Sequence, residues 1–255
     1  MDKKDEKFYG IILAGGTGSR MGSDIPKQFL DLEGKPVLQY SIEAFEKSAV
    51  DGFIIVVNEA YRDACEEILS VAGAVKFAGF AENGSERVWS VKNGLDKVRD
   101  ICIYRESRDI PEVNDVYVLI HDGARPLITA ELINDCINAV RTAGACVPAL
   151  ELKDTVKTAD KDMYVTSTPD RSTLRAVQTP QCFLLDLILE AYGIKEKDAD
   201  NAENFIPTDD ASMVERYTDT KVLMIPGNEK NLKITTPKDM QLARILLQNK
   251  DGIQQ

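Results

Sequence analysis

The sequence predicts an α/β protein with a Rossmann-like, mostly parallel sheet and helices on both faces. Two observations predict it. Before residue 150, short β-branched runs alternate with amphipathic segments, and this alternation requires crossover connections between parallel strands. The first of these runs, Phe8–Leu13, leads directly into a glycine-rich loop. The predicted strands are Phe8–Leu13, Gly52–Val57, Ala74–Phe77, Val116–His121 and Ala145–Ala149. The predicted helices are Val37–Ser48, Ala60–Val71, Ser85–Val98 and Ala130–Ala143.

The alternation of predicted strands and helices ends at about residue 150. Leu152–Lys157 and Met163–Ser167 read as two strands around a turn at Ala159–Asp162, which predicts a projecting β-hairpin arm at about 152–168. We expect the arm to belong to a single domain that covers residues 1–255. A hairpin with few apolar residues is marginally stable by itself. We therefore expect this arm to pack on a partner chain.

The other segments read as connectors and two late helices. Asp100–Asn114 is polar and charged and predicts a surface excursion, and Gly193–Asn204 predicts a charged connector. A helix is expected over Thr208–Tyr217 with Thr208 as its cap, although Ala211 stands where a capping box needs an acidic residue. The closing helix is expected over Thr236–Gln248, and residues 249–255 are expected to fray.

Composition excludes several classes of protein. The formal charge of -11 argues against nucleic-acid binding, which needs a basic face. No apolar stretch approaches the roughly 20 residues that span a bilayer, so we expect a cytoplasmic protein without a membrane partner. The five cysteines are an odd number without C-x-x-C spacing, which predicts buried reduced thiols. An anionic small molecule stays possible if cations gather in one cleft, because charges are screened over about 8 to 10 Å.

The glycine loop is the strongest sign of such a cleft. In Leu13–Gly22, glycines let the backbone approach an anion, while Arg20 and the nearby Lys27 supply positive charge. The loop departs from the dinucleotide fingerprint G-x-G-x-x-G because its third position is Met21. The string G-x-x-x-x-G-K-[ST] of ATPases is absent from the sequence. The loop therefore predicts a triphosphate site of another class.

A second polar motif, His121–Pro126, follows an apolar strand. Asp122 in it is suited to hold a hydrated magnesium ion near phosphates or to fix a ribose hydroxyl. A carboxylate that only caps a turn is the alternative. His121 is the single histidine of the chain, and its place at a strand end favours a hydrogen-bonded structural role over that of a general base.

Further polar clusters lie at element boundaries. Gly84–Val91 leads into a helix, where backbone groups and Ser90 could read the edge of a base, although an ordinary helix start fits as well. The remaining clusters are Thr168–Arg171, Gln178–Gln181, Thr208–Ser212 and Asn231–Pro237, the last of which contains Lys233.

Taken together, these segments resemble the 2-C-methyl-D-erythritol 4-phosphate cytidylyltransferase family, from about residue 9 to residue 248. The first motif, L-A-G-G-x-G-x-R-M-G, is shared by nucleotidyltransferases of many sugars. The strings that narrow the resemblance are P-K-Q at 26–28, G-x-x-R-x-x-S-V at 84–91, H-D-G-A-R-P at 121–126, D-R at 170–171, T-P-Q at 179–181, T-D-D-A-S at 208–212 and N-L-K-I-T-T-P at 231–237.

The resemblance implies a transfer of a cytidylyl group from CTP to a polyol phosphate, with Mg2+ and a homodimer that shares its sites. It implies catalytic roles for Arg20, Lys27, Arg171 and Lys233. It implies nucleotide contacts from Ala14, Gly15, Gly16, Gly18, Gly84, Ser85, Ser90, Asp122 and Gly123, with Asp122 also near the metal. The substrate contacts expected are Arg125, Thr155, Thr179 and Thr208, and Thr155 and Arg171 lie on or beside the arm between subunits. Ser85 and the longer 100–114 loop depart from the family pattern.

Three alternatives stay open at this point. A ribitol 5-phosphate cytidylyltransferase has the same loop and chemistry, but Gly123, Ala124 and the T-D-D string favour methylerythritol phosphate. A nucleotide sensor without turnover predicts loss of the cations, all four of which are present in the sequence. A molybdopterin guanylyltransferase shares only the first loop.

Overall fold

A computed structural model describes residues 6–16, 25–106, 115–197, 205 and 207–251. Within these residues the centre of the molecule is an eight-stranded mixed sheet, ordered β10-β7-β11-β6-β1-β4-β5, with β12 also paired to β7. Its strands are β1 (Glu6–Leu13), β4 (Gly52–Val57), β5 (Phe77–Glu82), β6 (Asp115–Asp122), β7 (Ala145–Glu151), β10 (Arg175–Val177), β11 (Gln181–Leu184) and β12 (Leu223–Pro226). The strands β6, β1, β4 and β5 run parallel, whereas β11 and β10 are antiparallel to their neighbours.

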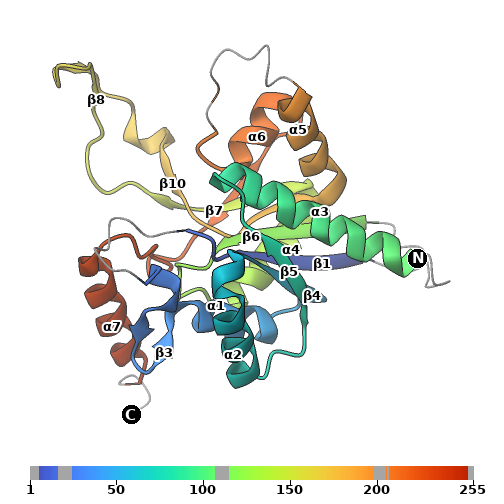
Figure 1. Cartoon of the computed structure of the whole chain (residues 1–255). Coiled ribbons are helices and arrows are strands. Elements are labelled where there is room, and N and C mark those ends of the chain that lie inside the picture. The colour runs from blue at the N-terminus through green and yellow to red at the C-terminus, as the bar shows by residue number, and fades with distance from the viewer. Residues whose placement is uncertain (1–5, 17–24, 107–114, 198–204, 206, 252–255) are drawn as a thin grey trace.

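Helices cover both faces of the sheet, as predicted (Figure 1). Alternation along β4 explains the two layers: Phe53 and Ile55 belong to one core cluster, while Ile54 and Val56 belong to the other. One face packs α1 (Val37–Lys47), α2 (Arg62–Ala72) and α4 (Ala130–Ala143). The other packs α3 (Arg87–Glu106), α5 (Leu185–Lys197) and α6 (Asp210–Tyr217).

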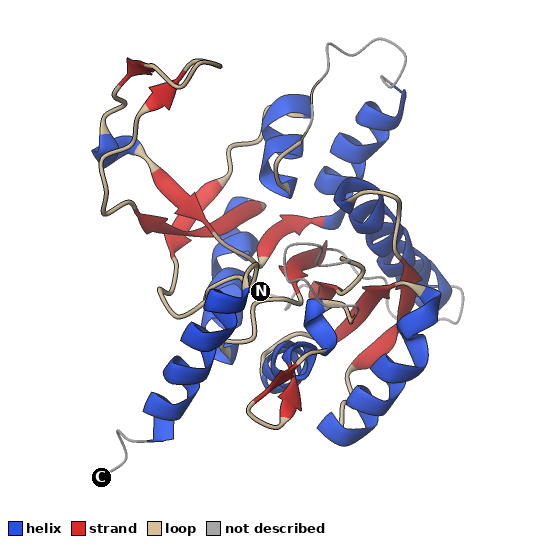
Figure 2. Cartoon of the chain, turned by 60° about the vertical axis from the view of Figure 1, so that its left-hand side comes forward, coloured by secondary structure: helices blue, strands red, loops and turns tan. Residues whose placement is uncertain are grey.

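A smaller third layer lies beside the sheet. The two-stranded β2 (Asp31–Leu32) and β3 (Lys35–Pro36) and the helix α7 (Pro237–Asp251) share an apolar cluster that includes Leu32, Ile234 and Met240. Two short turns, η2 (Lys27–Phe29) and η3 (Glu59–Tyr61), precede β2 and α2. Figure 2 shows α7 descending away from the sheet toward the C-terminus. None of the helices in the described ranges is long and apolar enough to cross a membrane.

The register of the central strands brings two predicted motifs together. Leu13 at the end of β1 is the parallel partner of Asp122 at the end of β6, and the Gly123 N–H donates to the Leu13 carbonyl at 3.0 Å. A β-carbon on Gly123 would lie 2.9 Å from that carbonyl oxygen, so the close approach requires glycine. The glycine loop and the His121–Pro126 motif therefore leave the sheet side by side, at the carboxyl ends where ligands bind in α/β folds.

Most predicted elements are confirmed, and the errors have physical reasons. The strand predicted at Ala74–Phe77 lies at Phe77–Glu82, because Gly79, at a φ of 140°, interrupts its apolar pattern. Helix α3 continues to Glu106, seven residues into the predicted excursion, because Cys102 stays on its buried face. Helix α7 extends to Asp251, so residues 249–251, which were predicted to fray, are helical. Residues 107–114, 198–204 and 252–255 lie outside the described residues.

The segment after β7 projects from the body as an arm, whose strands β8 (Thr158–Ala159) and β9 (Val165–Ser167) appear at the upper left of Figure 1. The first predicted strand, Leu152–Lys157, is wrong: only Thr158 and Ala159 pair with β9. Apart from Val156, the side chains over 153–157 are charged or polar and offer no apolar face for a longer ladder. Strands β10, β11 and β12 and helix α5 were not predicted, and β11 makes the sheet mixed rather than parallel.

Candidate functional site

A cavity of about 320 Å³ opens at the carboxyl ends of β1 and β6. It is lined by Leu13, Gly15, Gly16, Lys27, Gln28, Asn83, Gly84, Ser85, Glu86, Arg87, Ser90, Asp122, Ala124 and Lys233. These residues come from the glycine loop, the turn η2, the start of α3, the end of β6 and the segment before α7. The structure therefore brings together four of the motifs that were separate in the sequence.

The glycine loop and η2 form one wall. Lys27 donates through Nζ to the main-chain carbonyl of Ile234 at 2.7 Å. Ile234 directly follows Lys233, so this bond holds Lys27 against the segment that carries Lys233. Gln28 donates to the carbonyls of Ala14 and Gly16. The β-carbon of Asn83 lies 2.4 Å from where a side chain on Gly15 would begin, so only glycine fits at that position. Gly18 and Arg20 lie outside the described residues.

Asp122 is the centre of a charge cluster. Its carboxylate lies 2.9 Å from Lys233 Nζ, 3.6 Å from Arg125 Nε and 3.7 Å from Arg87 Nε. Burial opposes ionisation of this side chain, but Arg87, Lys233 and Arg125 together hold the pKa of the Asp122 carboxyl well below its usual range. The site therefore contains a fixed anion surrounded by three cations, which is an arrangement suited to a ligand that carries several negative charges.

Arg87 is itself held by a second carboxylate. Its guanidinium donates to both oxygens of Asp210, at 2.9 and 2.7 Å, and Asp210 has no exposed surface. The Tyr192 hydroxyl donates to the same carboxylate at 2.8 Å. The cap of α6 is Asp209, which forms a capping box with Ser212. The predicted cap, Thr208, is therefore wrong by one residue, and Asp210 is left to pair with Arg87.

The entry to α3 forms the opposite wall. The Gly84 N–H donates to Ser90 Oγ at 3.0 Å, and Ser90 Oγ donates to the Glu86 carbonyl. A β-carbon on Gly84 would lie 2.4 Å from Trp89 Cβ, so this turn folds back tightly on the helix. The Ser90 hydroxyl thus fixes the turn, and Ser85 is exposed at its edge.

His121 is a buried residue next to Asp122 and contacts the side chains that position it. It is fully buried, with Nδ1 at 3.0 Å from Thr179 Oγ1 and Nε2 at 3.5 Å from Ser41 Oγ. Burial lowers the pKa of His121 to about 3. Thr179 Oγ1 also accepts the Asp122 N–H at 3.1 Å, so this buried hydroxyl orients the strand end that carries the carboxylate. The structural role predicted for His121 fits this environment.

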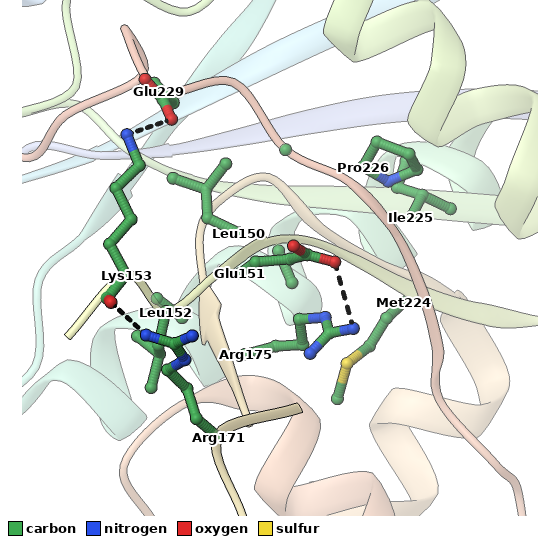
Figure 3. Close-up of a pocket in the computed structure, with 13 residues that line it drawn as sticks. Leu150, Glu151, Leu152, Lys153, Arg171, Arg175, Met224, Ile225, Pro226 and Glu229 are labelled. Atoms are coloured by element: carbon green, nitrogen blue, oxygen red, sulfur yellow. Dashed lines mark hydrogen bonds and ion pairs between the residues drawn. The ribbon is translucent and has the colours of Figure 1, made fainter. Parts of the chain in front are cut away.

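Two predicted residues lie away from this cavity. Arg171 is on η4 (Arg171–Thr173) at the base of the arm and lines a larger cavity of about 1100 Å³ with Lys153, Arg175 and Glu229 (Figure 3). Arg171 donates to the Lys153 carbonyl there. Thr155 is exposed on the arm itself. Within one chain, Arg171 and Thr155 therefore do not line the cavity that contains Lys233.

The other predicted residues, Ala14, Gly123, Arg125 and Thr208, do not line the cavity. Ala14 and Gly123 are buried in its wall, and Arg125 donates through Nη1 to the Asn231 carbonyl at 2.7 Å. Thr208 is exposed before α6. The larger cavity at the arm contains neither the glycine loop nor Asp122, so the smaller one is the candidate active site.

Comparisons with known proteins identify the relatives of this site. The model of the family described as 2-C-methyl-D-erythritol 4-phosphate cytidylyltransferase (IspD) matches residues 8–249. The chain belongs to this family. A protein of that name from Lachnospira eligens is 42% identical over 239 residues, which cover 93% of this chain and 97% of the relative. A second, from Geobacillus kaustophilus, is 38% identical over 241 residues, with 94% and 96% covered.

Solved structures agree with the family assignment. The 4-diphosphocytidyl-2C-methyl-D-erythritol synthase of Anaerococcus prevotii superposes with a TM-score of 0.75 at 30% identity, covering 96% of this chain and 99% of that one. The cytidylyltransferase of Thermus thermophilus has a TM-score of 0.68 at 26% identity, with 94% and 98% covered. The fold is therefore the α/β nucleotidyltransferase fold of these cytidylyltransferases.

Three residues that form or support the cavity, Gln28, Arg87 and Asp210, were not predicted as site residues. Gln28 and Arg87 stand inside the strings P-K-Q and G-x-x-R, and Asp210 stands inside T-D-D-A-S. The sequence therefore contained a sign of their importance, because each of the three residues lies within one of the family motifs. The pattern did not reveal that an arginine at the start of α3 pairs with a carboxylate 123 residues away.

The Asp122 carboxylate in the cavity fits a divalent cation whose other ligands are phosphate oxygens. No cluster of three or more potential ligands occurs among the residues that the structure describes. Mg2+ in such sites commonly uses one or two carboxylates plus phosphate oxygens and waters. Asp122, ionised and only 11% exposed, is the residue of the cavity that would hold such an ion.

Proposed function

We propose that this chain transfers the cytidylyl group of CTP to 2-C-methyl-D-erythritol 4-phosphate, giving CDP-methylerythritol and pyrophosphate. The observation that carries the proposal is the cavity in which Lys27 and Lys233 meet Asp122 at the carboxyl ends of β1 and β6. Family membership over residues 8–249 supports the choice of substrates.

The reaction is an in-line displacement. An oxygen of the acceptor phosphate forms a bond to the α-phosphorus of CTP, the bond from that phosphorus to the bridging oxygen breaks, and pyrophosphate leaves with that oxygen. An ionised phosphate needs no general base, and the buried His121, with both nitrogens beside hydroxyls, is not in a position to act as one.

Charge stabilisation is then the main task of the protein. Lys27 provides a compact ammonium for the phosphoryl oxygens, and Arg20 is proposed to hold the outer phosphates with its planar guanidinium. Lys233 binds the acceptor phosphate. A divalent cation bound by Asp122 would neutralise phosphate oxygens. The cytosine and ribose are proposed to lie against the wall formed by Gly84, Ser85 and Ser90.

We also propose that two copies of the chain share their sites. Met163, Tyr164 and Val165 at the tip of the arm are 81, 74 and 61% exposed, which leaves a run of apolar side chains for another surface. Arg171 and Thr155 lie outside the cavity of their own chain, so a partner's arm is the means by which they would reach the acceptor. A cytoplasmic location is consistent with the five buried thiols, which form no disulfide.

The activity is tested by incubating the protein with magnesium, each of the four nucleoside triphosphates, and either methylerythritol 4-phosphate or ribitol 5-phosphate. The measurement is pyrophosphate release. We expect release only with CTP and methylerythritol 4-phosphate. If pyrophosphate is released with ribitol 5-phosphate and not with methylerythritol 4-phosphate, the acceptor is ribitol 5-phosphate. If no pair releases pyrophosphate, the result favours a nucleotide sensor.

The shared site is tested by mixing two inactive variants, Lys27→Ala and Arg171→Ala, after unfolding and refolding them together. If each site combines the body of one chain with the arm of the other, a mixed dimer regains one intact site. Equal amounts then recover about a quarter of wild-type activity, since half of the dimers are mixed. Each variant refolded alone is the control. If Arg171 acts within its own chain, the mixture stays as inactive as the variants.

A further inference from the structure

Gln28 is a buried polar side chain in the wall of the active-site cavity. It is 3% exposed and immediately follows Lys27 in η2. Its Nε2 donates to the carbonyl of Ala14, where β1 ends, and to the carbonyl of Gly16 at 3.0 Å. One side chain thus connects η2 to two carbonyls at the entrance of the glycine loop.

These two bonds determine which way the loop presents its backbone. In a trans peptide, the carbonyl and the following N–H point in opposite directions. When Gln28 draws the Ala14 carbonyl toward itself, the Gly15 N–H is directed away from Gln28. Backbone N–H groups attract phosphate oxygens, whereas carbonyl oxygens repel them. The bonds from Gln28 therefore engage two carbonyls that would otherwise oppose a triphosphate.

The surroundings leave the loop entrance little freedom. Asn83 packs on the other side of Gly15, close enough to exclude any side chain there. The Ala14 N–H donates to the Val56 carbonyl of β4 at 2.8 Å. The Val56 carbonyl, Asn83 and Gln28 therefore all constrain the segment Ala14–Gly16. Of these, Gln28 alone is a side-chain donor to the Ala14 and Gly16 carbonyls in the described part of the loop.

Glutamine suits this task chemically. The two hydrogens on one Nε2 satisfy two acceptors at once, and the side chain carries no charge that would compete with Lys27. A glutamate has no donor and would face both carbonyls with a negative charge. A methionine has similar length and volume but no donor.

We propose that Gln28 is a positioning residue for the nucleotide: it holds the Ala14 and Gly16 carbonyls so that the entrance of the glycine loop receives the triphosphate. The inference rests on the proposed function. It assigns Gln28 an effect on CTP binding rather than on the acceptor. Its signature is a change in the affinity for CTP that exceeds the change in turnover.

The test compares Gln28→Met and Gln28→Glu with Gln39→Met. Gln39 is also a buried glutamine, at 5% exposure, but its amide donates to Glu43 on α1, away from the cavity. Loss of two hydrogen bonds is expected to weaken CTP about tenfold in Gln28→Met, and the glutamate is expected to weaken it by about 100-fold. The KM of the acceptor and kcat should each change less than about threefold in Gln28→Met.

Affinity is measured by titrating CTP without acceptor, so this readout does not need turnover. Thermal unfolding of each variant sets a temperature at which all are folded. CTP affinity in both Gln28 variants equal to that of Gln39→Met would overturn the inference, even if the Gln28 variants are less stable. If the wild type itself bound no CTP, the proposed function would fail first.

Discussion

The Lys233 ammonium lies 2.9 Å from the Asp122 carboxylate, and this ion pair joins the segment before α7 to the end of β6. The other two cations near Asp122 have further partners: Arg87 is held by Asp210, and Arg125 by the Asn231 carbonyl. Lys233, whose side chain is 38% exposed, is the most accessible of the three. It is therefore the cation that can leave Asp122 for an incoming phosphate.

Replacing Lys233 tests this role. In Lys233→Met we expect the KM of the acceptor to rise more than the KM of CTP, because the ammonium is assigned to the acceptor phosphate. Steady-state kinetics with each substrate varied in turn provide the measurement. Lys238→Met, which removes an exposed lysine from α7, is the matched control. A larger rise in the KM of CTP would contradict the assignment.

Replacing Lys27 tests the transition-state role. Lys27→Ala is expected to lower kcat by on the order of 10² to 10³, as for the loss of one charge-stabilising donor. Folding should be retained, because Lys27 lines the cavity and its ammonium donates there to the Ile234 carbonyl, outside the apolar core. Turnover and circular dichroism are measured beside Lys47→Ala, an exposed lysine at the end of α1. Wild-type turnover in Lys27→Ala would remove this residue from the mechanism.

The bidentate pair of Arg87 and Asp210 leads to a prediction about stability. Arg87→Met leaves the fully buried Asp210 carboxylate with the Tyr192 hydroxyl as its one remaining side-chain donor among the described residues. Loss of one partner of a buried pair costs about 3 kcal/mol or more. Removing both charges, in Arg87→Met with Asp210→Leu, should cost less than the sum of the single changes. Urea unfolding of the four proteins measures this coupling, and simple additivity would show that the pair contributes nothing.

The sequence was sufficient to predict the elements whose patterns are local. Helix α4 has the predicted bounds because Thr129 caps it and Gly144 ends it in the left-handed region at a φ of 74°. The meeting of the glycine loop with Asp122 could be anticipated too, because parallel strands end at one edge. These features depend on neighbouring residues or on a general rule of the fold.

The parts that could not be predicted depend on distant partners. The short strand β11 has no alternating pattern of its own, and its place between β6 and β7 is set by both neighbours. Gln28 looks like an ordinary polar residue until the carbonyls it bonds are known. Asp210 appeared to be one member of a capping motif, but its burial beside Arg87 is a property of the folded chain.

The buried His121 predicts a pH dependence of stability. Its folded pKa is lowered to about 3, so the folded protein keeps the imidazole neutral. As the pH falls below about 6.5, the unfolded chain binds a proton that the folded chain does not, and the free energy of unfolding decreases. The stability that this residue contributes is present above about pH 6.5 and is lost progressively toward pH 3.

Between pH 6.5 and pH 5 the loss should be about 2 kcal/mol, since each pH unit below the unfolded pKa corresponds to about 1.4 kcal/mol. His121→Asn removes the titrating group while keeping a polar partner for Thr179. We expect this variant to be less stable than the wild type at pH 7 but to show a flatter dependence on pH over that range. Urea midpoints at several pH values measure both slopes. Because the carboxylates are the same in the two proteins, equal slopes would mean that His121 can be protonated without unfolding.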